Sequence, residues 1–129
     1  MGNRAVIQLE STPEVGIYLH WNGSPDMVEA FLQVAKNKGI RDDDYGVARL
    51  AQIIGNAIGG TLSMGINAID RCDCDNGDNG LYVVRGWEVV ERKHLRGIED
   101  TPIDPDHLRK LVKEVEEYNE RPLCTAPIH

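Results

Sequence analysis

Residues 16–38 read GIYLHWNGSPDMVEAFLQVAKNK, and this stretch joins a strand to a helix through one short turn. Up to Trp21, apolar and polar side chains alternate, which is the period of a strand with one buried face. From Met27 onward, apolar side chains recur at helical spacing. Between the two patterns stand three residues favoured at a helix start, namely Ser24, Pro25 and Asp26. The stretch therefore predicts a strand near 16–21 and a helix near 25–38.

The turn itself carries polar and aromatic side chains suited to ligand binding: His20, Trp21, Asn22 and Ser24. Free N–H groups at a helix N-terminus favour anions, and an aromatic ring can stack on a flat ligand. The simpler interpretation is that Trp21 lies in the core, His20 faces solvent and Ser24 only caps the helix. A similar capping sequence recurs at 104–106 without a comparable cluster. Capping alone therefore does not explain the cluster, and we hypothesise a ligand pocket at this turn.

The remaining pattern predicts three more strands and two more helices. The strands are expected near 4–10, 62–69 and 81–91, and the helices near 44–58 and 105–120. Gly86 predicts a bulge or bend within the last strand. The order ββααββα fits an α+β domain, in which an antiparallel sheet of about four strands is covered by helices. We expect one domain over residues 1–121 and a frayed tail over 122–129.

The helix predicted over 44–58 is apolar on most of its sides, which favours a place in the core. Contact with a second copy of the chain is the alternative, and we expect a homo-oligomer. Its strongly polar residues fall at i, i+3 and i+7, on one stripe: Arg49, Gln52 and Asn56. This stripe is either the solvent edge of the helix or the wall of a polar pocket. In the second case Arg49 would bind a carboxylate or phosphate.

The segment 70–80 is rich in Asp, Asn and Gly, and it resembles two kinds of metal site without satisfying either. It lacks the calcium-loop order, because Gly77 falls where a ligand is needed. Zinc would need Cys72 and Cys74 together with Cys124 and a histidine such as His94, but only one tight pair exists. An odd number of cysteines also favours reduced thiols. We predict a solvated hairpin loop with a structural role, and no metal or other cofactor.

The composition of the 129 residues is that of an ordinary globular protein, with 41% hydrophobic and 27% charged residues. A formal net charge of −7 argues against direct binding of nucleic acid, although it allows a local anion pocket. No apolar run reaches the roughly 18 to 20 residues that span a bilayer, and the N-terminus lacks the apolar region of a signal peptide. We expect a cytoplasmic protein without a membrane contact.

Three segments together resemble an uncharacterised family of small proteins carried by phages and other bacterial mobile elements: GIYLHWNGSPDMVEAFLQVAK, YGVARLAQIIGNAIGGTLSMGI and DCDNGDNGLYVVRGWEVVER. The resemblance covers most of residues 1–92 and carries over no catalytic residues. Small accessory proteins of such elements often antagonise host defence, by binding an immune nucleotide signal or by occupying a defence protein's surface. The resemblance therefore implies a binding protein, by analogy.

We accordingly predict a non-catalytic phage or mobile-element protein that acts against bacterial defence by sequestering a nucleotide-type signal or by blocking a host defence protein. The ligand would be small and anionic, held between the turn and the stripe by His20, Trp21, Asn22, Ser24, Arg49, Gln52 and Asn56. The alternative is a small enzyme with His20 as acid or base, although the chain has no catalytic signature such as a P-loop. A third hypothesis is an acidic protein that blocks a partner without any pocket.

Overall fold

The computed structural model describes residues 3–58, 63–94 and 102–120. Along the chain the elements are β1 (Ala5–Leu9), β2 (Val15–Leu19), α1 (Pro25–Asn37), α2 (Asp44–Ile58), β3 (Met64–Ala68), the short 3₁₀ helix η1 (Ile69–Arg71), β4 (Leu81–Arg85), β5 (Glu88–Lys93) and α3 (Pro105–Glu120). All three predicted helices are confirmed to within one residue at each end. Residues 122–129, which were predicted to form a tail, lie outside the described residues.

The strands form one sheet in the order β3-β2-β1-β4-β5. β1 pairs with β2 and β2 with β3 in antiparallel fashion, as does β4 with β5. The central pair differs, because β1 and β4 run parallel, with Val6 opposite Leu81. The α+β class is thus confirmed, but the prediction of an antiparallel sheet is wrong, since the sheet is mixed. Alternation shows which side chains share a face and leaves strand direction open.

The prediction of a single last strand over 81–91 is also wrong, because the chain reverses within it. Gly86 and Trp87 have φ angles of 60° and 62°, and they form the turn of a tight hairpin between β4 and β5. Two positive φ angles are typical of the hairpin turn whose twist matches that of its strands. Trp87 adopts this conformation, and its indole N–H donates a hydrogen bond of 2.7 Å to the carbonyl of Ile40. The sheet therefore has five strands among the described residues.

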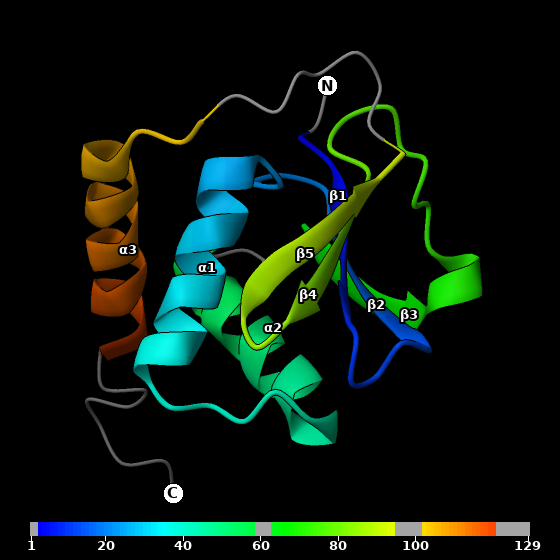
Figure 1. Ribbon diagram of the computed structural model, residues 1–129, viewed down its shortest axis with the longest axis horizontal. Coiled ribbons are helices and arrows are strands. Elements are labelled where there is room, and N and C mark those ends of the chain that lie inside the picture. The colour runs from blue at the N-terminus through cyan, green and yellow to red at the C-terminus, as the bar shows by residue number, and fades with distance from the viewer. Residues whose placement is uncertain (1–2, 59–62, 95–101, 121–129) are drawn as a thin grey trace, which may run out of the picture.

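One face of the sheet, here the helix face, is covered by α1 and α2, and α3 packs on the outer side of these two helices (Figure 1). The strand side chains buried on this face are Ala5, Ile7, Leu9, Ile17, Leu19, Tyr82 and Val84. From α2, Leu50, Ile53 and Ile54 complete the same core. The interpretation of α2 as a core helix is therefore confirmed. Its outward side carries Arg49 and Gln52.

The opposite face, here the loop face, is covered by η1 and the segment that follows it. Val6, Leu81 and Val83 are buried there, and Ile69, Cys72 and Cys74 pack on them. The segment crosses from edge strand β3 to central strand β4, so it is not a hairpin loop. Asn76 and Asn79 are buried within it. The prediction of a hairpin loop is therefore wrong, whereas Asp70, Asp73 and Asp75 are exposed, as the prediction of a solvated loop expects. The two buried amides bond to backbone groups and close the loop over the sheet.

No helix among the described residues is both long enough and apolar enough to span a bilayer.

Candidate functional site

The predicted polar stripe of α2 forms one wall of a hollow between α2, the end of α1 and α3. The hollow has a volume of about 210 Å³ and is lined by Lys38, Ile40, Arg49, Gln52, Ile53, Asn56 and Asn119. We call it the Arg49 hollow. Arg49 and Gln52 are exposed and Asn56 is half-buried, so the stripe is both a solvent edge and a pocket wall. The three stripe residues therefore share one cavity.

Two asparagines join α2 to α3 at this hollow. Asn56 Nδ2 donates to Asn119 Oδ1 at 2.9 Å. Asn119 Nδ2 in turn donates to the carbonyls of Ile53 and Val115, at 3.1 and 2.9 Å. Sequence reasoning missed Asn119, although a signal was present: Asn119 lies four residues after Val115 and so continues the inward stripe of α3. A polar residue on such a stripe needs buried partners.

The charge of the Arg49 hollow is opposite to that of the chain as a whole. Its lining contains Lys38 and Arg49 and no carboxylate, whereas the formal net charge is −7. Four other hollows on the described residues each include a carboxylate in their lining: Asp26 and Asp104, Asp73, Glu29, and Glu116. Within the described part of the chain, neither Lys38 nor Arg49 forms an ion pair. The hollow can therefore offer two cationic groups to an anion.

An exposed aromatic ring stands beside this hollow. Tyr45 is 61% exposed, and the guanidinium of Arg49 lies over its ring, 5.4 Å from the centroid. Arg41 approaches the same ring at 5.6 Å and also pairs with Asp43 at 3.2 Å. Such cation–π contacts hold a guanidinium without neutralising its charge. Tyr45 was not among the predicted site residues, because an exposed tyrosine at a helix start is ordinary.

The other half of the predicted site, the turn after β2, is built differently from expectation. β2 ends at Leu19, and Trp21 is 47% exposed, so Trp21 neither extends the strand nor belongs to the core. The His20 and Trp21 rings form a T-shaped pair with centroids 5.2 Å apart, and His20 Nδ1 shares a hydrogen bond of 2.9 Å with the Tyr18 hydroxyl. Asn22 adopts a φ of 63°, which completes the turn.

The N-terminus of α1, next to this turn, already binds a carboxylate of the chain itself, that of Asp26. Asp26 Oδ1 accepts the N–H of Met27 at 2.9 Å and the hydroxyl proton of Ser24. Ser24 stands at the N-cap position but makes no side-chain cap bond itself. Burial raises the pKa of the Asp26 carboxyl, but the bonds from Ser24, Met27 and His107 together outweigh it, and the pKa falls below its ordinary value. An external anion would therefore compete with Asp26 here.

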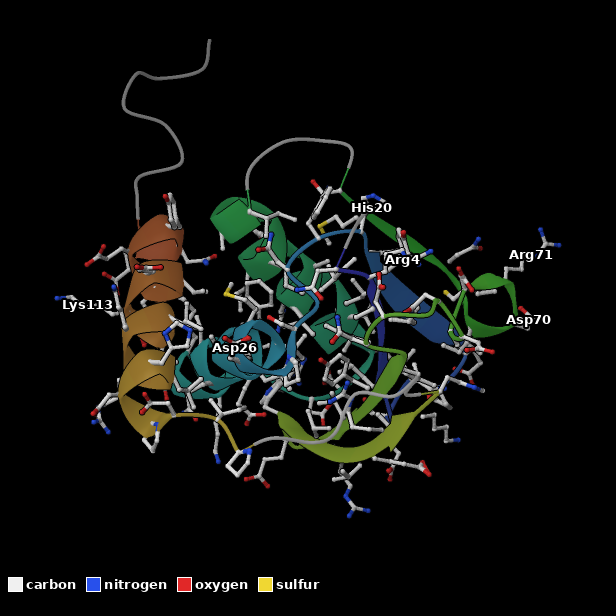
Figure 2. All side chains as sticks on the ribbon, turned by 90° about the horizontal axis from the view of Figure 1, so that it is seen from above. Arg4, His20, Asp26, Asp70, Arg71 and Lys113 are labelled. Carbon is white, nitrogen blue, oxygen red and sulfur yellow. The ribbon has the colours of Figure 1, made fainter. Side chains whose placement is uncertain are left out.

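The structure does not join the two halves of the predicted site. The lining of the Arg49 hollow includes no residue of the turn. Among the described residues, no hydrogen bond links the turn to the stripe either, and the turn is instead held by the N-terminal segment, since Asn3 N–H donates to the His20 carbonyl. Figure 2 shows His20 beside Arg4 on the sheet side of the molecule, with Lys113 of α3 at the opposite side. We therefore treat the turn and the hollow as separate places.

Within the described residues, no group of three or more histidine, cysteine, aspartate or glutamate side chains is placed to hold a metal ion. Cys72 and Cys74 are free and half-buried. Burial raises the pKa of both thiols above the ordinary value, and nearby acidic groups act in the same direction. Because the thiolate is the nucleophilic form, a raised pKa makes these cysteines less reactive at neutral pH than exposed thiols. Cys124 and His129 lie outside the described residues.

Comparisons of this chain with protein-family models, with curated proteins and with solved structures found no match.

Proposed function

We propose that this chain is a non-catalytic binding protein that holds a small anionic ligand of nucleotide type at the Arg49 hollow. The observation that supports the proposal is the pair Lys38 and Arg49 in a lining without a carboxylate, on a chain of net charge −7. A phosphate in the hollow would receive charge-assisted hydrogen bonds, each contributing about 1.5 to 3 kcal/mol. The amide of Gln52 adds a neutral donor beside them.

The size of the hollow favours a ligand that is only partly enclosed. Its volume of about 210 Å³ is below the roughly 300 to 1,000 Å³ of pockets that enclose a drug-sized molecule. A phosphate group fits inside, and an attached ring would then lie outside, where the exposed ring of Tyr45 stands next to Arg49. Stacking of a base on an aromatic side chain contributes about 1 to 3 kcal/mol. A nucleotide combines both groups.

The biological role that we propose follows the resemblance to mobile-element proteins. Such a protein would act against bacterial defence by sequestering a nucleotide signal, or by blocking the surface of a defence protein. The first route is favoured by the cationic hollow, since a surface block needs no pocket. An enzyme that uses His20 as acid or base is the alternative, and it predicts turnover of the nucleotide that is lost in His20→Ala.

Titration calorimetry with inorganic phosphate and with mono-, di- and cyclic nucleotides tests the proposal. Arg49→Ala should weaken binding at least about tenfold, which corresponds to the loss of about 1.4 kcal/mol. Arg41→Ala is the matched control, because it removes the same charge and a similar contact with Tyr45 while leaving the hollow intact. Trp21→Ala should bind as wild type does, if the turn takes no part.

Three results would contradict the proposal or redirect it. Absence of binding by the folded wild type would remove the ligand site. Equal weakening by Arg49→Ala and Arg41→Ala would show that general electrostatics, and not the hollow, attracts the anion. Loss of binding in Trp21→Ala alone would return the site to the turn after β2.

A further inference from the structure

The two edge strands of the sheet differ in charge. β5 carries four charged side chains, Glu88, Glu91, Arg92 and Lys93, whereas β3 reads MGINA and carries none. Charged side chains on an edge strand discourage pairing with another strand, and an uncharged edge lacks this protection. Among the described residues β3 pairs only with β2, so its outer edge is open.

The direction of the backbone groups of β3 follows from two hydrogen bonds at its ends. His20 N–H donates to the Ser63 carbonyl at 2.8 Å, and Ile69 N–H donates to the Glu14 carbonyl at 2.7 Å. Because backbone groups alternate along an antiparallel strand, the odd-numbered residues of β3 face β2. The even-numbered residues Met64, Ile66 and Ala68 therefore direct their N–H and C=O groups to the open edge. Of these, the Ala68 N–H is already bonded to Asn67 Oδ1 at 2.8 Å.

The central residue of this edge is a large apolar side chain that is exposed. Ile66 lies opposite Ile17 and so points to the helix face of the sheet, yet it is 53% exposed. The neighbouring Met64 reaches the core of that face, which leaves Ile66 as the apolar side chain at the rim. A strand added to this edge would cover it.

We propose that two copies of this chain associate through β3, antiparallel about a two-fold axis at Ile66, so that their sheets join into one. In this register Ile66 faces Ile66 of the second copy, and Met64 faces Ala68. The Ile66 pair exchanges two hydrogen bonds, and each Met64 N–H donates to the opposing Ala68 carbonyl. Both outward donors of each copy that are not already bonded thus find acceptors. The two exposed isoleucines come together on one face.

The distribution of charge favours a second copy of this chain as the partner of β3. Two chains of net charge −7 repel each other, so an uncharged strand is a favourable place for close contact. β3 is such a place, while the β5 edge would bring several charges together. The strand is also self-complementary about Ile66, which is what a two-fold interface requires. No residue of β3 lines the Arg49 hollow, so the proposed interface and the hollow are distinct surfaces.

Sedimentation of the full chain from low micromolar to near-millimolar concentration tests the proposal. The wild type should be a dimer at the upper end of this range. Ile66→Lys should weaken association at least about tenfold, because each dimer would place two like charges opposite each other. Val90→Lys is the matched control: Val90 is 43% exposed on the other edge strand, and the substitution adds the same charge. Its association should equal that of the wild type.

Two outcomes would overturn the proposal. One is a wild type that stays monomeric over the whole range, which would leave β3 free for a strand of another protein. The other is equal association of Ile66→Lys and Val90→Lys, which would place the interface elsewhere, for example on α2. If circular dichroism shows that Ile66→Lys does not fold, Ile66→Thr takes its place, because threonine keeps the β-branched shape that strands favour. It should then weaken association where Val90→Thr does not.

Discussion

The two faces of the sheet are buried by different means. On the helix face, apolar side chains from the helices pack on the strands, and Phe31, Leu50 and Ile54 are completely buried. On the loop face, the buried strand side chains are Val6, Leu81 and Val83. Their cover is a polar segment that is held by the hydrogen bonds of Asn76 and Asn79 and by the pair of Arg4 with Asp78.

The comparison shows that a sheet face can be covered without a helix if a loop satisfies its own polar groups. Asn76 bonds to four backbone groups of its own loop: the carbonyls of Asp73 and Gly80 and the N–H groups of Asp78 and Gly80. A buried amide with all its bonds made costs little, whereas one without partners is expensive. We therefore expect the helix face to depend on side-chain volume and the loop face to depend on individual hydrogen bonds.

The largest expected effect comes from truncating one buried leucine to alanine on each face of the sheet. Leu19→Ala on the helix face should cost about 4 kcal/mol of unfolding free energy, because the rigid core cannot close the cavity. Leu81→Ala on the loop face should cost about 2 kcal/mol, because the overlying loop can settle into the space. Urea denaturation monitored by circular dichroism measures both. A larger loss for Leu81→Ala would reverse the comparison.

The second prediction concerns the loss of hydrogen bonds within the segment that covers the loop face. Asn76 is 4% exposed, and its amide both accepts and donates within the loop. Asn76→Ala leaves those backbone groups without a partner, so it should lower stability by about 1 to 3 kcal/mol. The exposed Asn67→Ala in β3 is the control and should change stability by less than about 0.5 kcal/mol.

The same variant should open the loop locally. Cys72 and Cys74 pack on the loop face, so their reaction with a thiol reagent reports whether the loop is closed. In a Cys124→Ser background, Asn76→Ala should react faster than its parent, while Leu19→Ala should react at the parent rate under native conditions. If both variants react equally fast, global unfolding rather than loop opening would explain the exposure.

The fold was predictable where a short stretch of sequence determines the local structure. Apolar spacing and the capping residues predicted the helices, and Gly39, just after the C-cap of α1, has the positive φ of 69° that is common for glycine at this position. Strand direction could not be predicted, because parallel and antiparallel strands show the same alternation. The Gly86-Trp87 turn was missed as a hairpin because a tryptophan seldom takes a positive φ. Tertiary contact, including the indole bond to Ile40, stabilises it here.

The candidate site was predictable only within one helix. Arg49, Gln52 and Asn56 were placed together because helical spacing fixes their relation, and they do share a hollow. Lys38 and Tyr45 carried no sequence signal. Whether the turn and the stripe lie side by side depends on how α1 and α2 pack. The spacing of apolar residues carries no information about that packing. The burial of Asn76 and Asn79 could not be predicted, because composition does not distinguish amides that face water from amides that bond to their own backbone.

The third prediction concerns the backbone of the loop. Gly77 has a φ of 82°, and an added Cβ would meet Arg4 Nη2 at an ordinary contact distance of 3.6 Å. Gly77→Ala should therefore cost about 1 kcal/mol from backbone strain alone, without a clash. Gly65→Ala in β3 is the control, since Gly65 lacks a positive φ and an added Cβ meets open space there. Equal stability of both variants in urea would show that the loop backbone adapts freely.

The smallest effect is expected at the ion pair that joins the loop to β1, because both partners keep contact with water. The Arg4 guanidinium, 2.9 Å from the Asp78 carboxylate, and the Arg4 backbone N–H hold the pKa of that carboxyl below its ordinary value. A carboxyl with a lowered pKa in the folded state stabilises the fold above its unfolded pKa of about 3.9, and this contribution disappears as the pH falls through the folded pKa.

Asp78→Asn should therefore be less stable than the wild type at pH 7, and the difference should shrink from about pH 4 downward, as the wild-type carboxyl takes up its proton. Unfolding by urea at a series of pH values measures this difference directly. The exposed Glu117→Gln on α3 is the control, and its difference from the wild type should stay small throughout. A gap for Asp78→Asn that is constant from neutral to strongly acidic pH would show that the loop is held by the shape of the side chain. A gap that closes in acid would show that its charge closes the loop face, in contrast to the uncharged packing of the helix face.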